Sequence, residues 1–249
     1  VQDGEKGKLT RTLSAHLLCS RQQNDVANFT TYNRKTGVVT IQPVNVSGNW
    51  NGKVNIGFTS PLDLAQHFWL ETEVEASILR TKTFSGTESL GNIVPQINDN
   101  QFLSYKASVK PRLKLGTTDF TMSYDLILED NHSTYFSANN KKQWQHLIGG
   151  KLNTLLPFDI NFEANCRYHN YSGYLPHKRE HWVMLDIEFG KSLLKKKNLF
   201  VELSIHDFLN QNNGFFQQYN ATAFTQSHHR MLGRYGMLTL RYNFSSQKK

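Results

Sequence analysis

Polar and apolar residues alternate along much of this chain. In the segment FDINFEANCRYH, residues 158–169, every second side chain from Phe158 to Tyr168 is apolar or aromatic, and the side chains between them are polar. A period of two is typical of a β-strand with one apolar and one polar face, and ordinary strands have only about five or six residues. The pattern therefore predicts a long, two-faced strand at this position.

The same alternation recurs in eleven other segments, and none of them requires a helix. They are residues 8–19, 26–34, 37–45, 50–59, 67–80, 102–115, 120–129, 143–155, 182–189, 199–206 and 232–244. Strands that follow one another with no helix between them favour antiparallel pairing. We therefore predict an all-β fold of about twelve antiparallel strands, with residues 1–249 forming one up-and-down β-barrel domain.

The lengths of the connections indicate which face of the strands meets water. A soluble sandwich turns its apolar faces inward, whereas a transmembrane barrel turns them toward lipid and has short turns at one end and long loops at the other. Backward from the C-terminus the connections alternate between long and short: DFLNQNNGFFQQYNATAFTQSHHR, KSLLKKKN, NYSGYLPHKRE, LLP, DNHSTYFSANNKK, GTT, TKTFSGTESLGNIVPQINDN and SPLDLAQ. Before residue 50 the rule requires a short turn, and NRKTG fits that position. The alternation predicts a transmembrane barrel.

Aromatic residues accompany the short connections. Six phenylalanines lie beside them or at the end of the last strand, all assigned to apolar faces: Phe58, Phe68, Phe120, Phe158, Phe189 and Phe244. Such a set is typical of the aromatic girdle at one membrane interface. From Phe158 to Tyr168 the strand would rise by about 25 Å at a tilt of about 40°, so Tyr168, Trp144 and Trp50 are predicted at the opposite interface. The alternative is that these rings form the core of a soluble β-protein.

Composition narrows the class of protein further. The mean hydropathy is −0.53, and no apolar run approaches the roughly 20 residues of a membrane-spanning helix, so helical membrane proteins are excluded. The net charge of +8 is spread over short sets, so we expect no nucleic-acid partner. Cys19 and Cys166 are far apart and have no metal-ligand spacing, so we expect no disulfide framework, no metal site and no cofactor.

Three segments resemble a known family. Residues 48–80 (GNWNGKVNIGFTSPLDLAQHFWLETEVEASILR), 198–212 (NLFVELSIHDFLNQN) and 232–244 (LGRYGMLTLRYNF) are similar to the C-terminal barrel region of Bacteroidetes outer-membrane proteins of the TonB-dependent receptor type. The resemblance implies an outer-membrane location in contact with lipid, and uptake or binding of a solute at the cell surface. In that family a plug, on which a TonB-type energising complex acts, and an N-terminal domain precede the barrel. We therefore expect this chain to be the C-terminal part of a larger barrel.

The last predicted strand ends in two aromatic residues. Tyr242 and Phe244 lie on the same face, and only SSQKK follows them. The machinery that inserts outer-membrane barrels commonly reads a terminal aromatic strand in its substrates. We therefore predict that Tyr242 and Phe244 form an assembly signal.

Two neighbouring strands carry opposite charges on their polar faces. Glu71, Glu73 and Glu75 follow one strand, and Lys106, Lys110, Arg112 and Lys114 follow the next, with neutral Ser108 interrupting the basic run. If the apolar faces meet lipid, both sets face the lumen, and antiparallel pairing sets an acidic ladder against a basic one. The two interpretations are an ion-pair network that orders the wall and a polar track that guides a solute or grips a plug.

A catalytic interpretation has weaker support. His228, His229 and Arg230 lie at one end of the longest predicted loop, and His206 and Asp207 lie at the other, so a His/Asp cluster at the rim is one hypothesis. No GxSxG, HExxH or phosphate-binding glycine motif occurs. HDFLNQN is better explained as a strand entering a loop, where Asp207 supplies turn hydrogen bonds. We expect no enzymatic activity.

The sequence leaves three classes of function open. The first is the barrel of a TonB-dependent transporter or receptor. The second is a self-contained twelve-strand barrel that acts as a passive pore, adhesin or surface scaffold. The third is an outer-membrane enzyme with its site at the rim. The resemblance and the long predicted loops favour the first class.

Overall fold

The computed structural model of the protein describes residues 10–33, 35–89, 92–134, 140–173, 179–194, 197–212, 214–219 and 224–244. Within these ranges the regular elements are β-strands, apart from a 3-10 turn at Pro157–Asp159. No helix in the described ranges is long and apolar enough to cross a membrane. The all-β prediction is confirmed.

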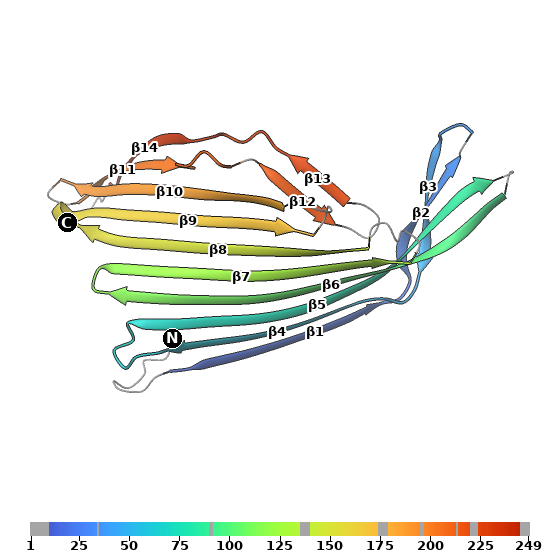
Figure 1. Cartoon of the computed structure of the whole chain (residues 1–249), viewed down its shortest axis with the longest axis horizontal. Helices are drawn as coiled ribbons and strands as arrows, with labels where there is room; N and C mark the ends of the chain where they lie inside the picture. The colour runs from blue at the N-terminus through green and yellow to red at the C-terminus, as the bar shows by residue number, and fades with distance from the viewer. Residues whose placement is uncertain are drawn as a thin grey trace.

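Ten strands lie side by side and form one curved wall (Figure 1). In spatial order they are β1 (Thr12–Gln22), β4 (Asn49–Pro61), β5 (Phe68–Ser89), β6 (Asn92–Leu115), β7 (Thr118–Ser133), β8 (Lys141–Leu156), β9 (Ile160–Ser172), β10 (Arg179–Leu193), β11 (Leu199–His206) and β14 (Tyr235–Tyr242). Every pairing within the wall is antiparallel. In the described part of the chain β1 and β14 each pair with one neighbour, so the wall is an open sheet with these two edges.

The connections of the wall alternate between its two ends. Short turns join β4 to β5, β6 to β7, β8 to β9 and β10 to β11, and they gather at the left in Figure 1. The two longest connections, 23–48 and 207–234, lie at the opposite end. The predicted alternation between the two ends of the wall is confirmed from β4 to β14. The predicted difference in length holds for 207–234, but it is wrong for the β5–β6 connection (90–91) and for the β9–β10 connection (173–178), which is no longer than the β4–β5 connection (62–67).

The predicted loop 81–100 is wrong because most of it is strand. β5 continues to Ser89, β6 starts at Asn92, and the two strands stay paired along this extension. Buried polar side chains support this extension: Asn98 and Asn100 of β6 are buried, and Asn100 Nδ2 donates a hydrogen bond to Thr83 Oγ1 of β5 at 3.1 Å. Buried polar groups that satisfy one another can support a strand pair without an apolar face.

The predicted strands 26–34 and 37–45 exist, but they lie outside the wall. β2 (Asp25–Asn33) and β3 (Val39–Val46) form a hairpin within the β1–β4 connection, and β2 pairs in parallel with the far end of β5. The turn of NRKTG, predicted on the short-turn side, therefore lies at the opposite end (Figure 1). The length rule failed because a hairpin inside a long connection divides it into three short pieces.

A second hairpin is missing from the sequence prediction. β12 (Phe215–Tyr219) and β13 (Phe224–His228) pair antiparallel within the 207–234 connection and form a separate two-stranded sheet. Their short lengths contain too few alternations to distinguish a strand from a loop. Each of the two longest connections thus carries a hairpin.

The wall has no packed apolar core within the described ranges. Ala27, Val46 and Trp182 are the buried hydrophobic side chains found there, whereas Leu17 and Leu240 are 83% and 65% exposed. A soluble β-sandwich would bury such side chains between two sheets. The exposed leucines do not fit the soluble alternative.

Candidate functional site: an apolar outer wall and a charged inner wall

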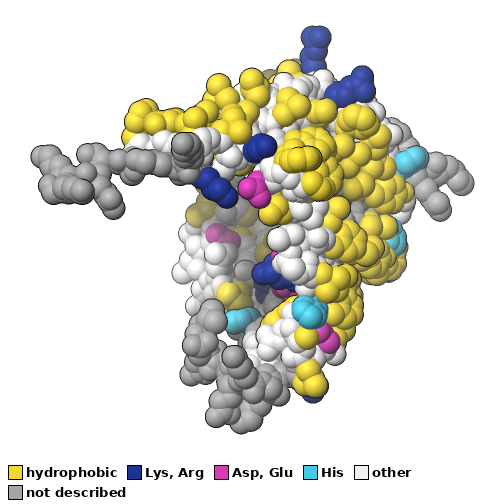
Figure 2. Space-filling model, turned by 90° about the vertical axis from the view of Figure 1, so that its left-hand side faces the viewer, with side chains coloured by type: hydrophobic (Ala, Val, Ile, Leu, Met, Phe, Trp, Pro, Cys, Tyr) yellow, Lys and Arg dark blue, Asp and Glu magenta, His cyan; other side chains and the backbone are white. Residues whose placement is uncertain are grey.

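Apolar and charged side chains separate onto the two faces of the wall. Figure 2, which looks along the strands from the short-turn end, shows hydrophobic side chains over the convex side and charged side chains in the hollow. We call the convex side the outer wall and the concave side the inner wall. The separation follows from the period of two, because neighbouring residues of a strand point to opposite faces. An apolar surface of this extent indicates contact with lipid.

The six phenylalanines of the predicted girdle are accessible rather than packed in a core. Phe58 is half-buried, Phe68 and Phe120 are 38% exposed, Phe189 is 40%, Phe158 is 83% and Phe244 is 89% exposed. Phe68 and Phe120 both lie opposite Leu113 of β6, so these two rings share one cross-strand row. This arrangement suits an interfacial girdle, whose contact with the membrane stays a prediction.

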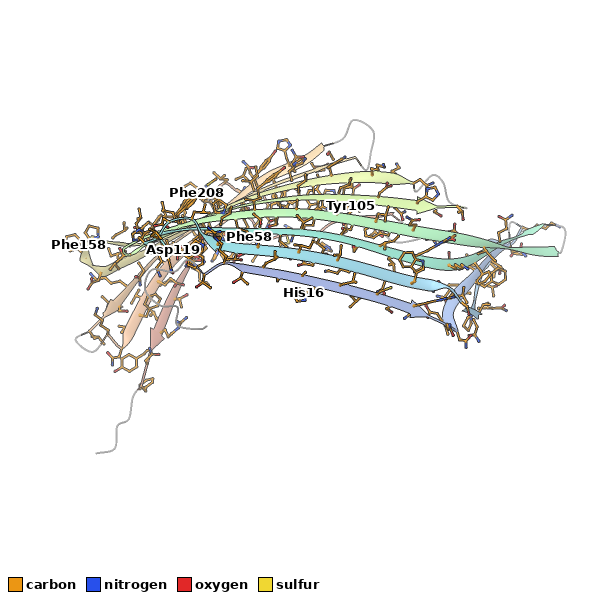
Figure 3. All side chains as sticks on the ribbon, turned by 90° about the horizontal axis from the view of Figure 1, so that it is seen from below. His16, Phe58, Tyr105, Asp119, Phe158 and Phe208 are labelled. Carbon is orange, nitrogen blue, oxygen red and sulfur yellow. The ribbon has the colours of Figure 1, made fainter. Side chains whose placement is uncertain are left out.

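Phe158 and Phe244 differ from the other four phenylalanines because neither lies on a strand, and Phe158 lies in a turn. Phe158 belongs to the 3-10 turn and has φ 68° and ψ 26°, and β9 begins only at Ile160. The predicted strand 158–169 is therefore wrong at its first residues. In Figure 3, Phe158 lies at the short-turn end of the sheet, beyond Phe58 and Asp119.

The three aromatics predicted at the opposite interface lie toward the other end of their strands. Trp50 is the second residue of β4, Trp144 is near the start of β8, and Tyr168 is near the end of β9. Trp144 is 41% exposed, and Trp50 and Tyr168 are half-buried. Their placement fits the predicted second girdle.

The structure places the two charged ladders opposite each other on the inner wall. Glu71 of β5 lies opposite Lys110 of β6, and Glu75 lies opposite Lys106. Farther along β6, Arg112 lies opposite Trp69, and Lys114 lies opposite Asp119 of β7. Two glutamates therefore lie opposite lysines, whereas Arg112 and Lys114 lie beyond the end of the acidic set.

The ion pairs connect more strands than these two ladders. Lys110 Nζ lies 2.9 Å from Glu71 Oε1, whereas Glu75 is paired with Lys53 of β4 at 2.9 Å. Arg112 is paired with Asp119 of β7. Because these groups are partly exposed, each pair contributes only about 0–1 kcal/mol to stability.

The network extends to strands that sequence analysis did not single out. Lys151 of β8 is paired with Glu163 of β9 at 2.7 Å, and Arg167 of β9 is paired with Asp186 of β10 at 3.1 Å. All four residues occupy polar positions of alternating strands. The alternation of polar and apolar residues could therefore have identified these four residues as members of the inner wall.

A comparison with protein families agrees with this geometry. The model of the outer membrane protein beta-barrel family matches residues 6–242. The chain belongs to this family. Membership places the protein in the outer membrane, in agreement with its apolar outer wall. No curated protein and no solved structure matches the chain.

Ser108 breaks the basic ladder of this outer-membrane barrel wall. Its cross-strand neighbours are Glu73 on β5 and Asp125 on β7, so Ser108 lies between two carboxylates. Ser108 Oγ is buried and has no hydrogen-bond partner within the described ranges. Lys106 Nζ lies 3.7 Å from Asp125 Oδ1 and supplies positive charge next to this row. The basic run is therefore not a continuous track.

The C-terminal strand of the barrel wall is shorter than predicted. β14 covers Tyr235–Tyr242 instead of 232–244, and Phe244 follows it. Asn198 Nδ2 donates a hydrogen bond to Tyr242 Oη at 2.7 Å, and the Tyr242 and Phe244 rings are 4.5 Å apart between centroids. The exposed Phe244 ring thus has Tyr242 as its aromatic neighbour and contributes little packing.

The residues of the hypothetical His/Asp cluster have separate neighbours. Asp207 is buried, and its two carboxylate oxygens accept hydrogen bonds from the backbone N–H groups of Gln211 and Asn212 at 3.0 Å each. His206 Nδ1 lies 3.7 Å from Asp186 Oδ1, and the His229 ring lies 3.3 Å from Ser227 Oγ. The predicted turn role of Asp207 is confirmed.

The described side chains include no group of three or more His, Cys, Asp or Glu residues arranged to hold a metal ion. Cys19 and Cys166 are exposed free thiols. The ion pairs of the inner wall join carboxylates to ammonium and guanidinium groups.

Proposed function

We propose that this chain forms the barrel wall of a TonB-dependent receptor or transporter that takes up or binds a solute at the cell surface. The supporting observation is the inner wall, where ion pairs run from Lys53 on β4 to Asp186 on β10. Such a surface suits water, a polar solute or a polar plug. The resemblance of residues 48–80, 198–212 and 232–244 to Bacteroidetes receptors of this type supports the same function.

In this proposal the wall is a rigid frame around a moving part. The pairs Glu71–Lys110 and Lys151–Glu163 each join neighbouring strands, so they fix the inner face while leaving half-exposed charged groups available to a solute or plug. A TonB-type complex of the inner membrane supplies energy through a plug. The outer wall contacts outer-membrane lipid, and the barrel assembly machinery reads Tyr242 and Phe244.

The proposal includes neither catalysis nor a nucleic-acid partner. The carboxylate of Asp207 accepts hydrogen bonds from its own turn, which supports a structural role for this residue. Basic side chains of the inner wall, such as Lys110 and Arg167, are paired with carboxylates rather than gathered into a patch. A patch of unpaired basic groups is what phosphate recognition requires.

One feature favours a second candidate function, that of a passive pore, adhesin or surface scaffold. A transmembrane β-strand needs about 9–11 residues, yet β5 has 22 and β6 has 24. The far ends of these strands, together with the β2–β3 hairpin, extend past the wall and provide a surface for contacts outside the cell (Figure 1).

Two measurements on the protein at its natural length separate these functions. Crosslinking in intact cells tests for an adduct with a TonB-type protein, and planar bilayers test for steady conductance. We expect an adduct and no steady conductance, because a plug closes the lumen until energy is supplied. Steady conductance without an adduct would instead support a passive pore, and the absence of both would support an adhesin or scaffold.

A further inference from the structure

One region of the inner wall carries carboxylates without matching cations. Glu163, Glu188 and Ser204 lie in register across β9, β10 and β11, and Glu202 precedes Ser204 by two residues on the same face. Glu163 is paired with Lys151 at 2.7 Å. Within the described ranges, Glu188 and Glu202 have no ion pair. The inner wall is therefore locally acidic, in contrast to the balanced ladders of β5 and β6.

These three carboxylates line a cavity. It has a volume of about 570 Å³ and lies near the short turns, and its lining includes Asn153, Asn161 and the ring of Phe200. Pockets that bind small molecules have volumes of about 300–1,000 Å³. The cavity is thus large enough for a small organic molecule or for one long side chain.

Phe200 gives the cavity an aromatic surface, and Gly190 makes room for it. A Cβ atom at Gly190 would lie 2.6 Å from Phe200 Cζ, so only glycine allows the ring to pack this closely against β10. Gly190 lies opposite Glu202, which brings the ring beside a carboxylate. The guanidinium carbon of Arg241 lies 5.9 Å from the Phe200 ring centroid, so this ring already attracts one cation.

A buried hydroxyl points independently to a missing partner. Ser204 is 1% exposed, and its Oγ has no hydrogen-bond partner among the residues that the structure describes. It lies opposite Glu188 and next to Glu202 along the same face. Buried hydroxyl groups are normally hydrogen-bonded. Ser204 does not itself line the cavity, but a ligand N–H group that reaches between Glu188 and Glu202 would supply the missing bond to Ser204.

We propose that this cavity binds the ammonium or guanidinium group of an organic cation. Glu188 and Glu202 accept hydrogen bonds from the cation, and Phe200 covers its face. Carboxylates beside an aromatic ring suit such a group, whereas the described residues form no cluster suited to a metal ion. The cation is either a free solute or a Lys or Arg side chain of a polypeptide segment in the lumen. The inference does not depend on TonB-driven transport, because the site lies in the wall itself.

Equilibrium binding to the full chain, folded in detergent micelles, tests this site. The probes are arginine amide and a capped Gly/Ser peptide that contains one arginine. We expect at least one probe to bind, and Glu188→Gln together with Glu202→Gln to weaken its binding by about tenfold or more, because hydrogen bonds to charged groups are lost. Binding of arginine amide identifies a solute site, and binding of the peptide alone identifies a site for a polypeptide segment.

Glu71→Gln is the matched control, because Glu71 is also an inner-wall carboxylate but is already paired with Lys110. It should leave binding unchanged. Phe200→Leu, which keeps both carboxylates, should weaken binding by a smaller factor and guards against a folding defect in the double variant. The proposal is overturned if neither probe binds, or if the double variant and Glu71→Gln bind equally well.

Discussion

Phe244 and Phe158 are the two most exposed phenylalanines of the predicted girdle, and both lie at the short-turn end. They are 89% and 83% exposed, but Phe244 follows the last strand whereas Phe158 lies in a turn. Replacing Phe244 by Ala should lower the free energy of unfolding by less than the roughly 1.5–3 kcal/mol that a fully buried ring contributes, because little of this ring is buried. We therefore predict that Phe244→Ala lowers the amount of protein in the outer membrane severalfold, while the protein that arrives keeps its heat resistance.

Quantitative immunoblots of outer-membrane fractions, with and without heating, measure both quantities. Phe158→Ala is the control and should change neither. Equal surface amounts combined with lower heat resistance for Phe244→Ala would show that this ring acts through packing alone.

Asp63 provides a pH-dependent contact in the turn between β4 and β5. The hydrogen bond from the Phe68 backbone N–H, at 2.7 Å, is the largest cause that holds the pKa of Asp63 below its ordinary value, and the His67 backbone N–H adds to it. A folded-state pKa below the unfolded value means that Asp63 stabilises the fold above the unfolded pKa, and that this stabilisation is lost as pH falls through the folded pKa.

We therefore predict that Asp63→Asn flattens the acid side of the stability profile. Thermal unfolding in detergent between about pH 5 and pH 2 should show a smaller decrease of the midpoint for the variant than for the unchanged protein. Parallel curves for the two proteins would rule out a contribution from this carboxylate.

At the scale of elements, the two ends of the wall differ in their tolerance of inserted sequence. The tip of the β2–β3 hairpin lies in the connection 23–48 at the long-loop end, whereas the Gly116–Thr117 turn joins two wall strands directly. An epitope after Thr36 should therefore be bound by antibody on intact cells. An epitope after Gly116 should be bound only after the outer membrane is opened.

The opposite staining pattern would contradict this orientation of the wall. It would mean that the NRKTG turn faces the periplasm. Immunofluorescence before and after permeabilisation distinguishes the two cases. Total expression of each variant should be compared by immunoblot, because an insertion between paired strands also disturbs their register.

The period of two predicted most of the wall, because a strand with one lipid face and one polar face must alternate. The period of two failed to predict segments that do not have one lipid face and one polar face. The extension of β5 and β6 is supported by polar cross-strand pairs such as Asn100 and Thr83, and β12 and β13 are too short to show a period. Local sequence also cannot tell a turn of the wall from a turn inside a loop, which is why NRKTG was placed at the wrong end.

The charged residues of the inner wall were predictable, but their partners were not. Alternation identifies Glu75 as polar, and antiparallel pairing sets it opposite Lys106, yet its ion pair is with Lys53 on the other neighbouring strand. Long side chains reach diagonal neighbours as easily as direct ones. The acidic cavity depends on the register of three strands and on the absence of a side chain at Gly190. No local sequence motif indicates either feature.

At the scale of the whole molecule, two tryptophans report which face meets lipid. Trp144 is 41% exposed and occupies an outer-wall position, whereas Trp182 is buried and stacks between His169 and Tyr171, with ring centroids 4.9 and 5.4 Å away. In liposomes that contain brominated lipid, a variant that keeps only Trp144 should lose much of its fluorescence. A variant that keeps only Trp182 should lose little.

Bromine quenches only by close approach, so the same two variants in unbrominated liposomes give the reference intensities. Stronger quenching of Trp182 than of Trp144 would mean that the concave side meets lipid. That result would reverse the assignment of inner and outer walls.

The longest pairing of the wall has a consequence for how the chain crosses the bilayer. β5 and β6 are paired from Ser89 and Asn92 at their tip to Phe68 and Leu113 at their base. An unpaired strand would carry bare peptide groups into hydrocarbon at a cost of several kcal/mol for each group, whereas a closed hairpin carries its peptide groups already satisfied. Closing a loop of so few residues also costs little chain entropy. We therefore expect β5 and β6 to zip together from their tip and to translocate as one unit.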